Sequence, residues 1–210
     1  MTVVVCFGDS NTYGFDQATY GRFPKGVRWP GVLAAELGAT AEVIEEGLNG
    51  RTTIWDVPYL AGRNGRSYLL PCLRSHAPVD FLVIMLGTND TKTIFGRSAA
   101  EIAAGAGALV DDALASCCGI DGGAPRVLLV APPSPGEVTE RSEVWGFGEA
   151  RAKGERMPGL YRTVASMAGV AFLDASALVG VDPDDGVHLT PQGHATLGRE
   201  VARVVRELLR

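Results

Sequence analysis

The stretch Phe81–Leu86 reads FLVIML and is an unbroken run of apolar residues. A strand with one face in water alternates apolar with polar residues, whereas a strand covered on both faces is apolar throughout. Thr2–Phe7 (TVVVCF) and Val127–Ala131 (VLLVA) show nearly the same continuous pattern. These three stretches therefore predict the centre of a parallel sheet that is buried on both sides.

Helical patterns alternate with strand-length runs along the chain. Two further strands are predicted at Glu42–Glu45 (EVIE) and Val170–Asp174 (VAFLD). Helices are predicted near Trp29–Leu37, Tyr68–His76, Ser98–Ser116 and Glu149–Met167, and a last helix begins at Pro191 with Thr190 as its cap. This alternation indicates an α/β fold of three layers, a five-stranded parallel sheet between helices. Because crossovers are right-handed, the simplest topology is flavodoxin-like, with strand order 2-1-3-4-5.

Length and composition limit the classes of function. The 210 residues predict a single domain over residues 1–210, since domains average about 150 residues. The net charge is −5 and no basic block offsets it, which argues against a nucleic-acid partner.

The first apolar run is far shorter than the ~20 residues of a membrane span and lacks the features of a signal peptide, so we expect no membrane partner and a cytoplasmic location. The cysteines show no metal-ligand spacing and are expected to be reduced thiols. A stripe of arginines on the last helix is predicted to be solvated: Arg199, Arg203, Arg206 and Arg210.

Residues that can carry chemistry follow four of the predicted strands. They lie in the segments Gly8–Asn11, Gly47–Gly50, Gly87–Asp90 and Asp182–His188. Because the carboxyl ends of parallel strands share one edge of a sheet, we expect Ser10, Asn89 and His188 to lie close together. A serine, two glycine-rich turns, an asparagine and an Asp-x-x-His sequence are what acyl transfer through a serine nucleophile needs.

Each residue type has a defined part in that chemistry. The Ser10 hydroxyl needs a base, and the neutral imidazole of His188 can accept its proton and later return it. Asp185 precedes His188 by three residues, so its carboxylate can hold the ring in the required tautomer. The tetrahedral intermediate needs hydrogen-bond donors for its negative oxygen. The backbone N–H groups of Ser10 and Gly50 and the side-chain amide of Asn89 can supply three.

These features also have purely structural interpretations. A serine after a strand is most often a helix N-cap, and an asparagine there suits an ordinary turn. Asp182, Asp184 and Asp185 suggest calcium, but their spacing does not match an EF-hand loop. His194 lies inside the last helix and is interpreted as structural, and His76 has no acidic neighbour in the sequence.

Two long connections, Arg51–Ser67 and Pro132–Gly148, carry the aromatic residues Trp55, Tyr59, Trp145 and Phe147. Such loops are often functional, and the aromatic rings either cover the ends of the sheet or face a substrate. If Trp55, Trp145 and Phe147 line a dry substrate channel, an alcohol or a peroxide can compete with water for the acyl group.

Three short blocks of the chain resemble those of the SGNH (GDSL-type) hydrolase superfamily. Gly8-Asp9-Ser10 resembles its nucleophile block, Gly87-Thr88-Asn89-Asp90 its asparagine block, and Asp185-Gly186-Val187-His188 its Asp-x-x-His block. Longer strings resemble the subgroup that contains bacterial arylesterases and the mycobacterial acyltransferase/perhydrolase: Val27–Trp29 (VRW), Glu42–Thr53 (EVIEEGLNGRTT) and Val83–Lys92 (VIMLGTNDTK). The resemblance extends over nearly the whole chain.

This resemblance implies a three-layer α/β/α fold and hydrolysis of short-chain aryl or alkyl esters, with no metal and no organic cofactor. It implies Ser10, Asp185 and His188 as a catalytic triad, and Ser10, Gly50 and Asn89 as the oxyanion hole. It also implies a closed homo-oligomer, often an octamer, in which neighbouring loops narrow each channel. The expected partners are then a small-molecule ester and water or an alcohol.

Two alternatives stay open. A carbohydrate deacetylase or a lysophospholipase would use the same triad, although the lack of a signal peptide and of a carbohydrate-binding module disfavours an extracellular polysaccharide. A non-catalytic flavodoxin-like binding domain belongs to a different class. The chain has no phosphate-binding Gly-x-Gly-x-x-Gly or P-loop, and that class gives no reason for the Asp-x-x-His sequence.

Overall fold

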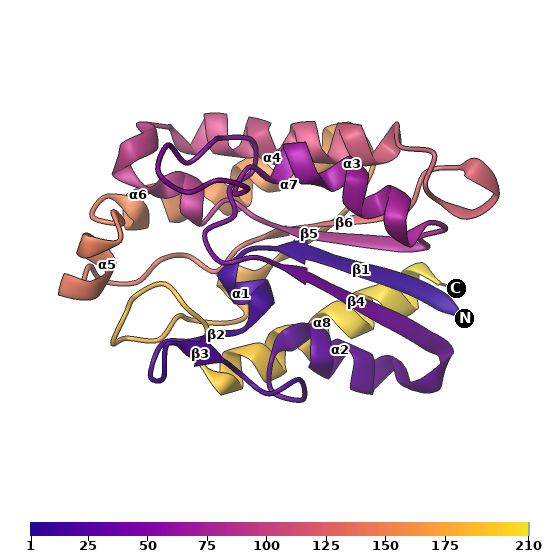
Figure 1. Ribbon diagram of the computed structural model, residues 1–210, viewed down its shortest axis with the longest axis horizontal. Coiled ribbons are helices and arrows are strands. Elements are labelled where there is room, and N and C mark those ends of the chain that lie inside the picture. The colour runs from indigo at the N-terminus through magenta and orange to yellow at the C-terminus, as the bar shows by residue number, and fades with distance from the viewer. Residues whose placement is uncertain (210) are drawn as a thin grey trace.

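The computed structural model describes residues 1–209 and contains a five-stranded parallel sheet (Figure 1). Its strands are β1 (Thr2–Gly8), β4 (Ala41–Gly47), β5 (Phe81–Met85), β6 (Arg126–Ala131) and β7 (Ala171–Asp174). They lie in the order β4-β1-β5-β6-β7, and each neighbouring pair is parallel. Numbered along the chain within this sheet alone, this is the order 2-1-3-4-5, and the predicted α/β class is confirmed.

Helices cover both faces of the sheet (Figure 1). One face carries α2 (Trp29–Leu37) and α8 (Pro191–Leu208), and the other carries α3 (Gly65–His76), α4 (Ala99–Leu114) and α7 (Met157–Ala168). Because successive side chains of a strand point to opposite faces, Cys6 packs in the core under α2 and α8, and Phe7 packs in the core under the other three helices. Both side chains are fully buried, which is why β1 is apolar throughout.

The single helix expected at Glu149–Met167 is wrong, because the structure has two helices there. The first, α6 (Ala150–Gly154), ends before Arg156, which precedes α7. Pro158 lies in the first turn of α7, where a missing N–H costs no hydrogen bond. Within one continuous helix, the same proline would remove a hydrogen bond and clash with the preceding turn. The break between α6 and α7 therefore places Pro158 in a first turn, where a proline is tolerated.

The connection Pro132–Gly148 contains a short helix, α5 (Glu140–Val144), that the sequence analysis did not predict. Its start is a capping box: the Thr139 hydroxyl accepts the Ser142 N–H at 3.1 Å, and the Ser142 hydroxyl accepts the Thr139 N–H at 2.8 Å. A capping box normally ends in Glu or Gln, so serine in that place conceals the helix start. This helix leads directly into Trp145, its C-cap residue.

The remaining elements are short. They are α1 (Ser10–Tyr13), the antiparallel hairpin of β2 (Phe15–Asp16) and β3 (Gly21–Arg22), and the 3₁₀ turns Gly38–Thr40, Asn89–Thr91, Thr93–Phe95, Ile120–Gly122 and Ala175–Ala177.

The last helix, α8, begins where the sequence predicted. The Thr190 hydroxyl accepts the Gly193 N–H at 3.1 Å, which makes Thr190 the N-cap. Its apolar stripe of Leu197, Val201 and Val205 is buried against the sheet. The arginines on the opposite side of α8, at positions 199, 203 and 206, are exposed, as predicted. Position 210 lies outside the described residues. Within residues 1–209, no helix is both long and apolar enough to cross a membrane.

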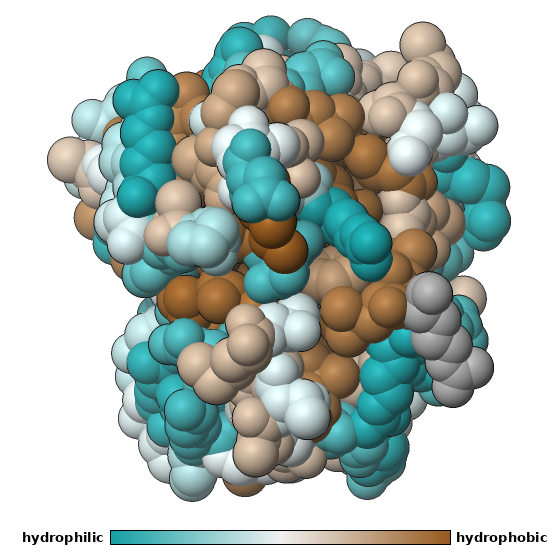
Figure 2. All heavy atoms as spheres, turned by 90° about the vertical axis from the view of Figure 1, so that its right-hand side faces the viewer, coloured by the Kyte–Doolittle hydropathy of each residue, from teal (hydrophilic) through white to brown (hydrophobic). Residues whose placement is uncertain are grey.

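The two ends of the sheet differ in what they expose. Figure 2 shows the end at which the strands begin, where hydrophobic atoms lie between the polar surfaces of the two helical layers. Ile120 and Leu209 are exposed there beside Phe81. The strands finish at the opposite end, and there the predicted chemical residues gather.

Candidate active site

Ser10 lies in the turn that joins β1 to α1. The side chain of Asp9 caps α1 by accepting the Asn11 N–H at 2.9 Å, and Ser10 is the first residue of that helix. The chain turns tightly at Gly8, where a β-carbon would lie 2.0 Å from the Thr12 hydroxyl oxygen and 2.8 Å from the Met85 carbonyl oxygen. Only glycine fits there, and it allows the serine to stand at the carboxyl edge of the sheet.

His188 contacts Ser10, although the two residues are 178 positions apart in the sequence. Its Nε2 lies 2.9 Å from the Ser10 Oγ, and its Nδ1 lies 2.7 Å from an Asp185 carboxylate oxygen. A carboxylate only accepts hydrogen bonds, so Nδ1 carries the proton and Nε2 is left as an acceptor for the serine hydroxyl. Ser10 and His188 each retain 6% exposure, so both are buried yet reachable from the cavity.

Two further contacts hold this arrangement in place. The Asn11 side chain donates to the Val187 carbonyl at 3.2 Å and accepts the Leu189 N–H at 2.9 Å, so it fastens the segment that carries His188 to the turn that carries Ser10. Asn11 was quoted in the sequence motif but had no predicted role. A local motif does not reveal a hydrogen bond to a segment so far away in the chain.

Asp185 is held in its charged form. Burial alone would raise its pKa, but the hydrogen bond and charge of His188 and the backbone N–H groups of His188 and Val187 outweigh burial and lower the pKa below its ordinary value. The two N–H groups donate to the other carboxylate oxygen at 2.7 and 2.8 Å. Asp185 is therefore a fixed, ionised acceptor for the imidazole.

Gly50 and Asn89 lie on the same edge of the molecule as Ser10, and all three line one cavity. Gly50 has φ +78°, a backbone conformation that residues other than glycine rarely adopt. The Asn89 amide donates to the Arg51 carbonyl at 3.1 Å and contacts an Asp9 carboxylate oxygen at 3.4 Å. The three residues that were predicted to supply oxyanion donors therefore come from three separate segments of the chain and line the same cavity.

Two buried carboxyl groups support these loops from inside the protein. Asp90 accepts the Thr53 N–H at 3.0 Å and also the Thr53 hydroxyl, which ties the loop after β5 to the loop after β4. Burial raises the pKa of Asp90 to about 7, and it raises the pKa of Asp9 to about 6. Neither group was assigned a role from the sequence.

The raised pKa of Asp90 predicts a pH-dependent contribution to stability. The folded state retains the proton up to about pH 7, whereas the unfolded carboxyl loses it near 3.8, so this stabilising contribution is complete below pH 3.8 and is lost as the pH rises toward 7. We therefore expect the free energy of unfolding of wild type, relative to Asp90→Asn, to fall across this interval in urea unfolding. A difference that does not change with pH would contradict a raised pKa.

A cavity of about 260 Å³ opens at Ser10 and His188 and has a largely aromatic wall. Phe15 and Trp145 pack against the imidazole, with ring centroids 4.7 and 5.6 Å from that of His188. Phe147 also lines the cavity, so the structure places both Trp145 and Phe147 where a substrate channel was predicted.

Trp55 does not line this cavity, and its predicted place in the channel is wrong. Its ring packs against the Arg97 guanidinium, whose carbon lies 4.1 Å from the ring centroid. The cause is the folding of the connection Arg51–Ser67 back on itself, where the Thr52 hydroxyl donates to the Trp55 carbonyl at 2.5 Å and the Asn64 amide donates to the Ile54 carbonyl at 2.9 Å.

Four other cavity-lining residues were not predicted: Phe15, Tyr20, Asn49 and Lys92. Phe15 and Tyr20 belong to the β2–β3 hairpin and its turn, which is too short to show a strand pattern. Asn49 and Lys92 lie inside the strings Glu42–Thr53 and Val83–Lys92, but no spacing rule assigned them a role. The Lys92 ammonium lies 4.8 Å from the Phe147 ring centroid, and burial lowers its pKa.

The competing histidines lie elsewhere. His194 is fully buried in α8, its Nδ1 accepts the Trp29 N–H at 3.3 Å, and burial lowers its pKa to about 3, so it is a neutral structural residue. The His76 Nε2 lies within hydrogen-bond distance of a Glu46 carboxylate oxygen, at 2.9 Å, and the position of Glu46 on a distant strand explains why the sequence around His76 could not indicate this partner. The aspartates at 182, 184 and 185 do not come together as a metal-binding group within residues 1–209.

Comparisons with known proteins show what this chain is similar to. The sequence pattern of the GDSL-like Lipase/Acylhydrolase family matches residues 6–196. A solved aryl esterase of M. smegmatis is 42% identical, with a TM-score of 0.93, over 99% of this chain and 100% of that one. A carbohydrate acetylesterase from Sinorhizobium meliloti is 40% identical with the same TM-score and coverage. A carbohydrate acetylesterase family member from the same organism is 36% identical, with a TM-score of 0.92, over 100% of this chain and 99% of that one. No curated protein matches the chain.

Proposed function

Because this chain belongs to the GDSL-like Lipase/Acylhydrolase family and is an ester hydrolase, we propose that it cleaves short-chain esters through an acyl-enzyme formed on Ser10. The observation that carries the proposal is the continuous contact from the Ser10 Oγ through the His188 ring to Asp185, with distances of 2.9 and 2.7 Å. A non-catalytic binding domain would have no use for that arrangement.

In the first half of the reaction the Ser10 oxygen attacks the ester carbonyl while its proton moves to the His188 Nε2. Asp185 stabilises the imidazolium that forms. The carbonyl oxygen becomes negative and is held by the N–H groups of Ser10 and Gly50 and by the Asn89 amide. The long 3.4 Å contact between Asn89 and Asp9 is the one that such an oxyanion would replace. Collapse of the intermediate breaks the ester bond, and His188 returns its proton to the departing alcohol.

In the second half, His188 takes a proton from water, and the resulting hydroxide attacks the acyl-enzyme. The carbon–oxygen bond to Ser10 breaks, the serine regains its proton from His188, and a carboxylic acid leaves. Every proton transfer in this cycle goes through the His188 Nε2, which lies within hydrogen-bond distance of the serine oxygen.

The size of the cavity favours small esters. About 260 Å³ lies at or below the lower limit of ordinary small-molecule sites, which hold roughly 300–1,000 Å³. We expect p-nitrophenyl acetate to be hydrolysed with a higher kcat/KM than p-nitrophenyl octanoate, measured by release of p-nitrophenol. Equal values for both esters would contradict a short acyl pocket.

The likeness to carbohydrate acetylesterases favours acetylated sugars as a second substrate class, and release of acetate from such a sugar tests it.

We also propose that an alcohol or a peroxide competes with water for the acyl group, because aromatic rings border the reacting histidine. We expect an ester formed from added alcohol to accumulate beside the free acid in aqueous buffer. Trp145→Ala should lower the ratio of transfer to hydrolysis, because removing the ring that packs on His188 admits water.

The matched control for this prediction is Trp55→Ala. Trp55 packs on Arg97 outside the cavity, so the ratio of the two products should stay as in wild type. Chromatography of both products from one reaction gives the ratio directly. Free acid alone in the presence of abundant alcohol would reject acyl transfer, and an equal change in both variants would reject the role of Trp145.

A further inference from the structure

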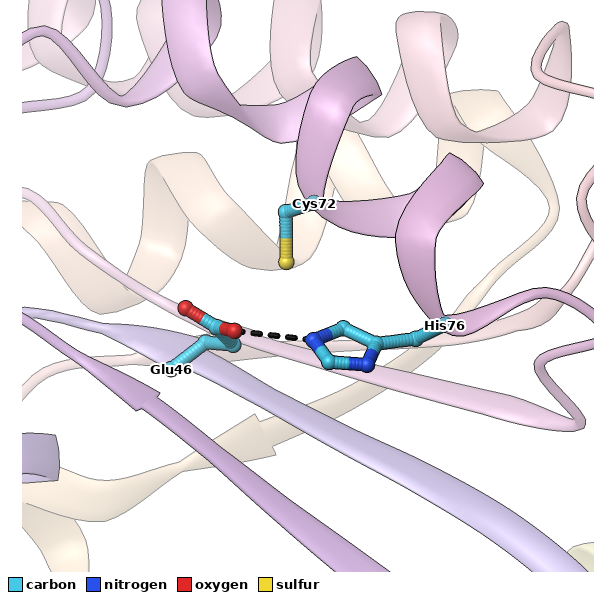
Figure 3. Close-up of side chains that lie close together, drawn as sticks. All are labelled: Glu46, Cys72 and His76. Atoms are coloured by element: carbon cyan, nitrogen blue, oxygen red, sulfur yellow. Dashed lines mark hydrogen bonds and ion pairs between the residues drawn. The ribbon is translucent and has the colours of Figure 1, made fainter.

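Glu46, Cys72 and His76 bring three potential metal ligands together between β4 and α3 (Figure 3). One oxygen, sulfur or nitrogen atom from each lies within 4.8 Å of the other two, and a Glu46 oxygen lies 2.9 Å from the His76 Nε2. Across residues 1–209, no other group of three or more His, Cys, Asp or Glu residues satisfies this distance. The cluster has no part in the proposed ester hydrolysis.

The fold creates the cluster from two elements. Cys72 and His76 are four residues apart on α3, so they lie on one face of the helix. Glu46 and Ile44 share a face of the edge strand β4, and Ile44 packs in the core beneath α3, which places the Glu46 carboxylate opposite that helix. Figure 3 shows the Cys72 sulfur directed from α3 toward the space between the carboxylate and the imidazole.

The burial of the three side chains is graded. Cys72 is fully buried, whereas the side chains of Glu46 and His76 retain 19% and 27% exposure, so two of the three ligands are reached from solvent. Burial and the nearby Glu46 carboxylate raise the pKa of the Cys72 thiol to about 12. A divalent cation reverses this condition, because a thiol that coordinates a metal loses its proton.

We propose that Glu46, Cys72 and His76 bind a divalent transition-metal ion of the Zn²⁺ type, with water as the fourth ligand. Thiolate, imidazole and carboxylate are the set that zinc prefers, whereas calcium and magnesium take oxygen ligands only. On binding, the Cys72 S–H bond breaks and its proton passes to the buffer. The hydrogen bond between the His76 Nε2 and Glu46 also breaks, and the proton that it holds leaves Nε2, so that the sulfur, nitrogen and oxygen atoms each form a bond to the ion. The charges of the thiolate and the carboxylate balance those of the ion.

One neighbouring charged group affects this site. The Arg51 guanidinium donates to the Glu46 and Gly8 carbonyls and stacks on the rings of Phe7 and Tyr68, so it is already engaged beside the cluster. Its positive charge opposes a cation, and only a ligand set with two anions overcomes that. A bound ion would fasten the edge strand β4 to α3 immediately before the turn that leads to Gly50.

The test is a titration of tag-free, chelator-treated protein with Co²⁺. A thiolate bound to Co²⁺ produces a sulfur-to-metal charge-transfer absorption, which an imidazole–carboxylate pair does not, and added Zn²⁺ should remove it. We expect one equivalent to bind, and Cys72→Ala and His76→Gln each to raise Kd at least tenfold, since even outer-shell partners of a metal site are worth ~10–100-fold in affinity. Zn²⁺ at about 100 times its Kd should raise the Tm of wild type by roughly 5–10 °C.

Two variants serve as controls. Cys117→Ser removes an exposed thiol, and Glu42→Gln removes an exposed carboxylate on the same strand, so both should bind like wild type. Circular dichroism without metal establishes that each variant is folded. No charge-transfer absorption in folded wild type, or equal affinity in wild type and His76→Gln, would overturn the proposal and leave the cluster as a hydrogen-bonded pair beside a buried cysteine.

Discussion

Replacing Ser10 with alanine is expected to lower kcat for p-nitrophenyl acetate by up to about 10⁶-fold. Alanine has no oxygen to attack the ester, so no acyl-enzyme forms, although His188 and the oxyanion donors remain. The substitution leaves the Asp9 cap of α1 intact, because that cap uses the Asp9 carboxylate and the Asn11 N–H. Wild type treated with a sulfonyl fluoride should carry one adduct by mass, located at Ser10, and the variant should carry none.

The control for this experiment is Ser166→Ala, which removes an exposed serine hydroxyl from α7. It should keep wild-type activity, and the Tm of both variants should establish that they are folded. Substantial turnover by folded Ser10→Ala would mean that another nucleophile acts or that the ester is cleaved without a covalent intermediate. The proposed function would then be wrong in its central step.

Asp185→Asn is expected to reduce kcat by about 10⁴-fold while leaving KM nearly unchanged. The Asp185 carboxylate accepts a hydrogen bond from the His188 Nδ1–H, with 2.7 Å between oxygen and nitrogen. An asparagine amide turned toward the ring donates instead, which moves the ring proton to Nε2 and removes the acceptor that the Ser10 hydroxyl needs. The backbone N–H groups of Val187 and His188 can still donate to the remaining carbonyl oxygen, so the loop should retain its shape.

Asp184→Asn is the matched control, because it removes the same charge one residue away on an exposed side chain. A loss of activity confined to position 185 assigns the effect to the contact with His188. Similar losses in both variants would assign it to the negative charge of the loop, and a negligible loss at 185 would remove Asp185 from the mechanism.

The hydrophobic pattern predicted most of the fold. All five strands of the sheet and four of the expected helices were located, because continuous apolar runs and capped amphipathic stretches are local features. The exception, Glu149–Met167, failed because an apolar helical pattern continues across a proline that starts a new helix. The helix α5 was missed because a serine completes its capping box in place of the usual glutamate.

The site was predicted unevenly. Ser10, Asn89 and His188 could be grouped because all follow strands whose carboxyl ends meet at one edge of a parallel sheet. The walls of the cavity obey no such rule, since loop conformation decides which aromatic ring faces it. Trp145 and Phe147 line the cavity and Trp55 does not, although all three are aromatic residues in long connections.

The amino-acid order alone settled which stretches become strands and helices, because burial periodicity and end caps act over only a few neighbouring positions. It also indicated which residues can supply a nucleophile, a base and hydrogen-bond donors. Only the folded chain decided the partners: Asn11 with the segment around His188, Asp90 with Thr53, and Glu46 with Cys72 and His76. These contacts join side chains far apart along the backbone, and their geometry depends on how strands, helices and loops pack together.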